Sequence, residues 1–327
     1  MEHRKLGKSE IELPVVTFGA WAIGGLFWGG NDDATAVTAI HAALDQGMDA
    51  IDTAPIYGCG HSENLVGKAL IGKREKVLLL TKCGLRWDDT SGEFFLQLTE
   101  TPDGRPVTVY KNVTAASIVW ECEQSLRRLQ TDRIDLYQMH WPSSSAPADE
   151  TMEALERLKK QGKIREFGVS NYSASQMGEA LMHGRIVSNQ VKYSLLERGI
   201  EQETLPFCRQ RNLGVICFSP MALGLLTGKV GMDRAFPPSD IRSSHKLYTP
   251  EIRARVLQAL ESLRPMAEAH QATLGHLAVA WVLAQPGVTT ALVGARTPQQ
   301  VEENAAAARL KLSPDEVSLI GKAFEGI

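Results

Sequence analysis

Short apolar segments alternate with amphipathic helical segments along the chain, and this alternation limits the fold more than any other feature. Eight segments rich in β-branched and aliphatic residues are predicted to be strands. They span residues 15–20, 50–54, 77–82, 134–140, 166–170, 189–193, 214–220 and 289–293. Most are nearly continuous in apolar residues, as in Val77-Leu78-Leu79-Leu80, which is typical of strands buried on both faces. The alternation therefore predicts a parallel sheet covered by helices.

The helical segments carry recognisable ends. Asp32 or Asp33 is expected to cap a helix that runs to Gln46, with Gly47 as its stop. Further helices are predicted over 114–129, 149–161, 173–183, 202–211, 251–284 (as two helices), 298–307 and 313–324.

Eight strands with no linker or composition break favour an α/β fold of the closed (β/α)8 TIM-barrel type, although a doubly wound sheet is the competitor. A length of 327 residues would suit two domains of ordinary size, but a barrel uses it as one, so we expect a single domain over 1–327. Long connections follow the third strand (84–113, with a turn signal at 101–106) and the seventh strand (221–250). Residues 1–14 are expected to form a hairpin across the barrel bottom.

Composition excludes several classes of protein. The formal net charge of −3 argues against nucleic acid as a partner, and no apolar stretch is long enough for a membrane span. The N-terminus lacks the apolar core of a signal peptide, and five cysteines without a CxxC pattern indicate reduced thiols in a cytoplasmic protein. No metal is expected, because no HExxH motif or Cys/His cluster occurs. The oligomeric state stays open.

Four ionisable residues follow strands of the predicted barrel, where active sites of this fold lie. Asp52 and Lys82 end the second and third strands, Tyr57 follows Asp52 by five residues, and His140 ends the fourth strand. A cationic Lys82 beside Tyr57 would lower the pKa of the phenol toward neutrality, while Asp52 pairs with the buried ammonium. The set suits proton transfer to a carbonyl oxygen. The alternative is a structural ion pair with two satisfied polar groups at the rim.

The chain resembles the aldo-keto reductase superfamily nearly end to end. The matching segments are Asp52-Thr-Ala-Pro-Ile-Tyr57-Gly, Gly58-Cys-Gly-His-Ser-Glu63, Thr81-Lys82, Ser125-Leu-Arg-Arg-Leu129, Ile134-Asp-Leu-Tyr-Gln-Met-His140-Trp141, Gly168-Val-Ser-Asn171, Gln190 with Tyr193, Phe218-Ser-Pro220 and Gly294-Ala-Arg296. Within the superfamily it is most similar to the bacterial branch that resembles potassium-channel β-subunits. The resemblance implies NADPH-dependent carbonyl reduction, with Asp52, Tyr57, Lys82 and His140 as the catalytic tetrad.

The resemblance also implies cofactor contacts. Ser170, Asn171 and Gln190 match residues that hydrogen-bond the nicotinamide carboxamide, and Tyr193 matches the aromatic that stacks on its ring. The pyrophosphate would lie against Ser219, Pro220, Met221, Ala222 and Leu223, with Lys229 and Arg242 as phosphate partners. The adenosine end would meet Gly294, Arg296, Gln300, Glu303 and Asn304, and Arg296 suits a 2′-phosphate, which favours NADPH over NADH.

Aromatic residues in the loops after the first, third and fourth strands suggest the walls of a substrate pocket. They are Trp21, Phe27, Trp28, Trp87 and Trp141. These walls suit a small carbonyl or alcohol, but the substrate and the preferred direction are not identified. The sequence also leaves open redox regulation through Cys59 or Cys83, which neighbour Tyr57 and Lys82.

The sequence thus predicts an oxidoreductase that reduces aldehydes or ketones reversibly, with Tyr57 as proton donor. Two alternatives stay open. One is a nicotinamide-binding redox sensor or channel β-subunit-like partner protein. The other is a barrel enzyme that binds no nicotinamide.

Overall fold

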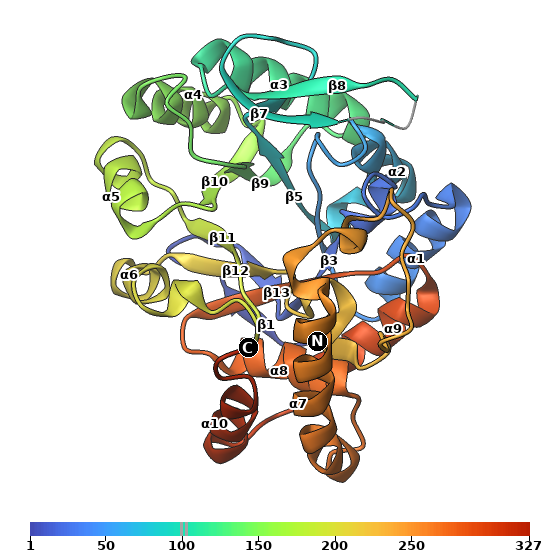
Figure 1. Ribbon diagram of the computed structural model, residues 1–327. Helices are drawn as coiled ribbons and strands as arrows, with labels where there is room; N and C mark the ends of the chain where they lie inside the picture. The colour runs from blue at the N-terminus through green and yellow to red at the C-terminus, as the bar shows by residue number, and fades with distance from the viewer. Residues whose placement is uncertain (99–100, 102–103) are drawn as a thin grey trace.

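The eight predicted strands close into a parallel barrel in the computed structural model, which describes residues 1–98, 101 and 104–327. Around the barrel they follow one another in chain order (Figure 1). They are β3 (Val16–Gly19), β4 (Ala50–Asp52), β5 (Leu78–Cys83), β9 (Ile134–Met139), β10 (Ile164–Ser170), β11 (Ser188–Lys192), β12 (Gly214–Phe218) and β13 (Val288–Gly294). The (β/α)8 prediction is confirmed, and the doubly wound alternative is wrong because β13 pairs with β3.

Helices surround the barrel (Figure 1). They are α1 (Asp33–Asp45), α2 (His61–Ala69), α3 (Ala115–Leu129), α4 (Ala148–Lys160), α5 (Ala174–His183), α6 (Thr204–Arg211), α7 (Pro250–Ala269), α8 (Leu274–Ala284), α9 (Pro298–Ala306) and α10 (Pro314–Ala323). Asp32 is the N-cap of α1, accepting a hydrogen bond from the Thr35 amide. Helix α8 is buried along nearly its whole length, because α7 and α10 pack against it.

Helix α2 is a difference from the sequence prediction. The helices predicted from the sequence include none between the second and third strands, whereas the structure has α2 beginning at His61. Gly60 before it has φ +94°, a left-handed conformation that glycine adopts without strain. The chain thus enters the helix that separates β4 from β5 directly after Tyr57.

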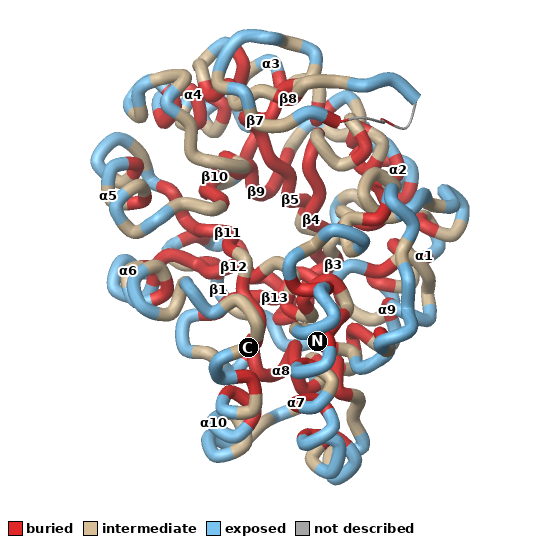
Figure 2. Tube along the Cα trace, in the orientation of Figure 1, coloured by how far each residue is buried: buried red, intermediate tan, exposed pale blue. Residues whose placement is uncertain are grey.

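Two apolar layers stabilise the barrel. One cluster packs between the strands and the helices, and a second, smaller cluster fills the lower interior from several strands. Figure 2 shows the barrel strands as mostly buried and the helices as exposed along part of their length. The predicted N-terminal hairpin exists as β1 (His3–Lys5) paired with β2 (Glu12–Pro14). Its connecting residues Leu6 and Ile11 pack with Leu80 and Leu136 of the interior. The hairpin therefore closes the lower end of the barrel.

The two long connections differ in structure. Residues 84–113 contain a small antiparallel sheet of β6 (Leu85–Arg86), β8 (Val107–Lys111) and β7 (Glu93–Leu98), in that order. The turn predicted at 101–106 includes positions 102 and 103, which lie outside the described residues. Residues 221–250 form short 3-10 helices and reach the connection after β3, where the Ile241 amide donates to the Phe27 carbonyl at 2.9 Å.

Among the residues that the structure describes, no helix combines the length and apolarity that crossing a bilayer would require.

Candidate active site

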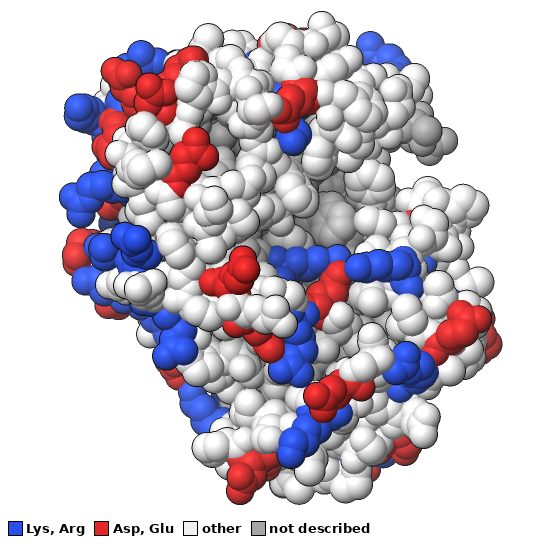
Figure 3. Space-filling view, turned by 60° about the vertical axis from the view of Figure 1, so that its left-hand side comes forward, with Lys and Arg blue, Asp and Glu red and all other residues white. Residues whose placement is uncertain are grey.

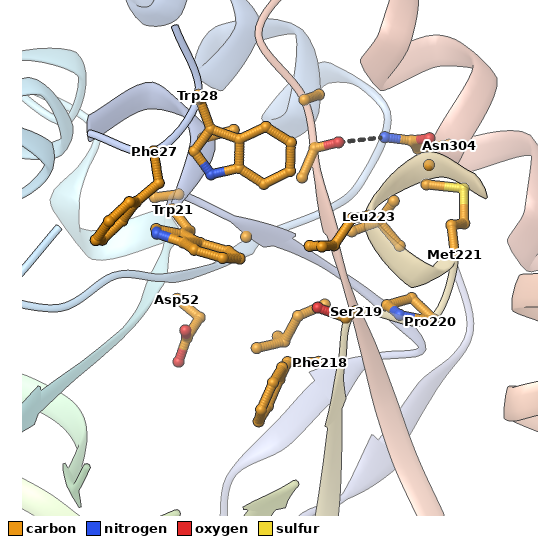
Figure 4. Close-up of a pocket in the computed structure, with 18 of the residues that line it drawn as sticks. Trp21, Phe27, Trp28, Asp52, Phe218, Ser219, Pro220, Met221, Leu223 and Asn304 are labelled. Carbon is orange, nitrogen blue, oxygen red and sulfur yellow. Dashed lines mark hydrogen bonds between the residues drawn. The ribbon is translucent and has the colours of Figure 1, made fainter. Parts of the chain in front are cut away.

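A cavity of about 660 Å³ opens where the barrel strands end. Three of the four predicted catalytic residues line it, namely Asp52, Tyr57 and His140, while Lys82 lies buried beneath them. Figure 4 shows Trp21, Phe27 and Trp28 on one side and Met221 and Leu223 on the other. In Figure 3, a hollow in the surface has lysine and arginine side chains along one edge. The cavity therefore gathers residues from strands distant in sequence.

The Lys82 ammonium is at the centre of the polar cluster. Its Nζ donates to Asp52 Oδ1 at 2.5 Å, to the Thr53 carbonyl at 2.9 Å and to Tyr57 Oη at 3.3 Å. Lys82 is fully buried and Asp52 nearly so, so each charge needs the other. The ring of His140 lies edge-on to Tyr57, with 5.9 Å between centroids. The structure thus brings together all four residues predicted from strand ends.

Burial changes the expected proton affinities. It raises the pKa of Tyr57 above its ordinary value, and the opposing charge of Lys82 only partly offsets this. The expectation that Lys82 lowers the pKa of Tyr57 toward neutrality is therefore wrong, since desolvation of the phenolate outweighs the effect of the ammonium. Burial opposes the charge on Lys82, but Asp52 and Tyr57 together outweigh burial, and the pKa of Lys82 is raised. Burial, and then Lys82, hold the pKa of His140 well below its usual range, so this cluster presents a protonated phenol beside a neutral imidazole.

Asp52 has two further partners on its second oxygen. Gln138 Nε2 donates to Oδ2 at 3.1 Å, and Gln190 Nε2 donates to the same atom at 2.8 Å. Sequence reasoning assigned no role to Gln138. Its signal was present, because a polar residue two positions before His140 on a strand predicted to be buried needs a hydrogen-bond partner.

The three polar side chains predicted to bind a carboxamide lie together. Asn171 Nδ2 donates to the His140 carbonyl at 3.0 Å and to Ser170 Oγ at 3.1 Å, and Ser170 Oγ donates to the Gln190 carbonyl at 2.9 Å. All three line the cavity. Asn171 has φ +62°, a strained conformation that tends to occur at functional sites.

The backbone after β12 bends sharply around one side of the cavity. Ser219, Ala222 and Leu223 have φ of +55°, +48° and +58°, and such left-handed values are unusual for residues with a Cβ. Ser219, Pro220, Met221 and Leu223 line the cavity, whereas Ala222 is buried behind them. The bend keeps this segment against the cavity rather than in a regular helix.

The part of the cavity over β12 and β13 is polar and basic. Lys229 and Glu303 form an ion pair at 2.6 Å, and Arg242 pairs with Asp240 at the same distance. Arg296 Nη1 donates to the Trp28 carbonyl at 3.1 Å. The predicted residues of this end all line the cavity: Lys229, Arg242, Gly294, Arg296, Gln300, Glu303 and Asn304.

Asn304 Nδ2 donates to the Gly294 carbonyl at 3.1 Å (Figure 4). A Cβ added at Gly294 would lie 3.7 Å from the nearest atom, the Gly19 carbonyl oxygen. Packing inside the protein therefore tolerates a side chain at Gly294, and any need for glycine comes from the cavity side.

The opposite part of the cavity has aromatic walls. Trp21, Trp28 and Trp141 line it as predicted, together with Phe95 of β7, whose ring centroid lies 5.7 Å from that of Trp141. Trp87 is not among the lining residues. Because β6 enters the small antiparallel sheet, Trp87 packs beneath that sheet, 6.0 Å from the Arg128 guanidinium.

Tyr193 is also outside the cavity, contrary to its predicted stacking position. It follows Gln190 by three positions, and odd spacing on a strand favours the opposite face. Its ring lies 5.5 Å from that of Trp281 on α8, and its hydroxyl donates to Glu201 at 2.6 Å. Phe218, at the end of β12 next to β11, is an aromatic that does line the cavity. Its place directly before Ser219-Pro220 was the signal that sequence reasoning missed.

Two further observations concern metal binding and thiol reactivity. Within residues 1–98, 101 and 104–327, no three His, Cys, Asp or Glu side chains group as a metal site requires. Cys83 is buried, and its pKa is raised well above the usual value by desolvation, so its thiolate is disfavoured.

Comparison with known proteins agrees with this arrangement. The model of the aldo/keto reductase family matches residues 15–325. The NADH-specific methylglyoxal reductase of Escherichia coli (strain K12) is 37% identical over 333 residues, covering 100% of this chain and 99% of that protein.

Two solved structures share the fold. The glycerol dehydrogenase AKR11B4 from Gluconobacter oxydans has a TM-score of 0.87 and 37% identity, covering 98% of this chain and 94% of that one. An aldo/keto reductase from Klebsiella pneumoniae, solved in complex with NADP and acetate, has a TM-score of 0.74 and 31% identity, covering 98% and 95%.

Proposed function

The chain belongs to the aldo/keto reductase family, and on this premise we propose that it is an NADPH-dependent oxidoreductase that reduces aldehydes or ketones to alcohols, reversibly. The observation that carries the proposal is the buried Asp52–Lys82 pair with Tyr57 Oη 3.3 Å from the ammonium, at the floor of the cavity. A bound nicotinamide supplies the hydride in such a reaction.

The residues of the cavity fit a dinucleotide. Amide and hydroxyl groups of Ser170, Asn171 and Gln190 suit a carboxamide, and cationic Lys229 and Arg242 suit phosphates. Both cations form ion pairs here, with Glu303 and Asp240, so phosphate binding would rearrange these contacts. Phe218 takes over the stacking role first assigned to Tyr193, because Phe218 faces the cavity.

In the proposed reaction, Tyr57 donates its proton to the carbonyl oxygen. Its raised pKa keeps the phenol protonated at neutral pH, and Lys82 stabilises the charge that develops on the phenol oxygen. His140, neutral through burial, donates a hydrogen bond that orients the carbonyl. Trp21, Trp28 and Trp141 would form the walls that hold a small substrate.

The choice of NADPH rests on Arg296. Its guanidinium lies at the adenosine end and is held by a hydrogen bond to the Trp28 carbonyl, so it can meet a 2′-phosphate without further ordering. Because the Escherichia coli relative is NADH-specific, a comparison of turnover with NADPH and with NADH tests this choice.

We also propose that the chain acts as one domain, since β13 pairs with β3 and joins the two ends of the sequence. A cytoplasmic location fits the buried thiols of Cys83, Cys122, Cys208 and Cys217. Cell fractionation tests the location, and a single cooperative unfolding transition is expected for one domain.

Replacement of one oxygen tests the function. Tyr57→Phe should retain NADPH binding but lose turnover of a carbonyl panel by roughly a hundredfold to ten-thousandfold, the usual range for a general acid. Tyr137→Phe is the matched control, because that phenol is buried outside the cavity. Undiminished turnover in Tyr57→Phe would contradict the assignment. Bound cofactor with negligible wild-type turnover would instead favour the redox-sensor alternative.

A further inference from the structure

Gln138 is the one member of the buried polar cluster to which the reaction assigns no role. It is fully buried on β9, and its Cα is the register partner of Lys82 across the β5–β9 pair. Adjacent positions in a parallel register place the two side chains in the same layer of the barrel interior. Gln138 therefore sits beside the Lys82–Asp52 pair.

The side-chain amide of Gln138 hydrogen-bonds both Asp52 and Gln190. Gln138 Nε2 donates to Asp52 Oδ2 at 3.1 Å, while Gln138 Oε1 accepts from Gln190 Nε2 at 3.1 Å. Gln190 Nε2 also donates to Asp52 Oδ2 at 2.8 Å. The three side chains form a closed triangle of hydrogen bonds, which fixes the amide orientation of both glutamines.

The triangle spans an intervening strand. Gln138 lies on β9 and Gln190 on β11, and between them the register partner of Gln138 on β10 is Gly168. A Cβ at Gly168 would come within 2.3 Å of Ser188 Oγ. The glycine therefore leaves room for Ser188, and the two amides meet across β10 at 3.1 Å.

The orientation of Gln190 has a consequence for the ligand. Because Nε2 of Gln190 is directed at Asp52 and Gln138, its Oε1 is the atom left to face the cavity that Gln190 lines. An exposed amide oxygen accepts a hydrogen bond and cannot donate one. The group it can recognise is an N–H, such as the amino group of a carboxamide.

We propose that Gln138 is a positioning residue that couples carboxamide recognition by Gln190 to the Asp52–Lys82–Tyr57 proton donor. It holds Gln190 with its acceptor toward the cofactor, and it holds Asp52 with one oxygen toward Lys82. The inference rests on the proposed function, since it requires a nicotinamide in this cavity.

Binding of two cofactors that differ in one group tests the coupling. NADP⁺ carries the carboxamide, whereas its 3-acetylpyridine analogue has a methyl ketone and no N–H donor. In titrations followed by protein fluorescence, the wild type should bind NADP⁺ more tightly than the analogue. Gln138→Met, which keeps the volume but removes both hydrogen bonds, should bring the ratio of dissociation constants closer to one, with the remaining preference coming from Ser170 and Asn171.

Kinetics separate positioning from a structural role. Gln138→Met should lower kcat roughly tenfold, as expected for the loss of a hydrogen bond to a buried charge, and raise KM for NADPH while leaving KM for the carbonyl unchanged. Gln138→Asn remains polar but is one methylene too short to join both partners, so the same changes are expected if Gln138→Met fails to fold. Thr290→Val is the control: it removes a buried bond from Thr290 Oγ1 to the Pro14 carbonyl without touching the triangle.

The outcomes are distinguishable. An unchanged binding ratio and unchanged kcat in both Gln138 variants, with at most a lower Tm, would overturn the inference and leave the proposed function intact. Failure of the wild type to bind NADP⁺, NADPH and NADH would overturn both. A ratio of dissociation constants that falls toward one in the Gln138 variants but not in Thr290→Val would support the coupling.

Discussion

The interior of the barrel changes from apolar to polar within one step along the same strands. Leu80 on β5 and Leu136 on β9 belong to the lower apolar cluster, whereas Lys82 and Gln138, two positions further on, carry the polar network. Side chains two apart on a strand share a face. The same face therefore serves stability in one layer and chemistry in the next, and the two layers should respond differently to mutation.

Mutations in the upper, polar layer, which contains Lys82 and Gln138, should lower both activity and stability. Lys82→Met leaves Asp52 charged and unpaired in the interior, so we expect a loss of stability of about 3–5 kcal/mol and a loss of kcat of more than a hundredfold. Urea unfolding and carbonyl reduction measure the two effects.

A double variant separates these effects. Asp52→Asn combined with Lys82→Met has no buried charge, so its stability should largely recover while its activity stays lost. If activity recovered together with stability, Lys82 would have only a structural role.

The lower layer should affect stability alone. Leu136→Ala removes buried methyl groups from the lower apolar cluster and is expected to lower the free energy of unfolding by about 2–5 kcal/mol. Its kcat per folded molecule should match that of the wild type, measured at a temperature well below the unfolding transition. A clear fall in kcat would mean that the two layers are not independent.

A second buried carboxyl, that of Glu121, shows what Lys82 contributes to the polar layer around Asp52. Glu121 on α3 is buried like Asp52, but its hydrogen bonds come from the Gly84 amide at 3.0 Å and from the Ser117 hydroxyl at 3.1 Å. Desolvation raises its pKa from about 4.5 to about 8. Between these values the folded chain holds a proton that the unfolded chain releases, so stability falls as pH rises through this window.

Glu121→Gln should therefore lose less stability than the wild type between pH 5 and pH 8 in urea unfolding. Glu123→Gln is the matched control on the same helix, because Glu123 is paired with Lys163 near the surface. Parallel pH curves for the wild type and Glu121→Gln would contradict the assignment of a raised pKa.

Local sequence patterns were enough to predict the strands, most of the helices and the grouping of Asp52, Tyr57, Lys82 and His140. Parallel strands in a closed barrel must end on one face, so polar residues at strand ends meet whatever the loops do. Patterns failed where side-chain direction depended on strand position. Trp87 packs beneath the small sheet of 84–113 and does not line the cavity. The stacking role that the resemblance implied for Tyr193 failed for the same reason, because Tyr193 points away from the cavity while Phe218 lines it.

The sequence by itself determined the barrel and the residues that meet at its mouth, because periodicity and strand ends are local properties. Only the tertiary structure decided which groups form hydrogen bonds with one another and how their pKa values shift. Gln138, Asp52 and Gln190 lie on β9, β4 and β11, and closure of the barrel is what brings their atoms within 3.1 Å. The pKa of Tyr57 depended in the same way on the surroundings, since burial outweighs the nearby Lys82. Desolvation and hydrogen-bond geometry act over a few ångströms, a scale that spacing along the chain does not specify.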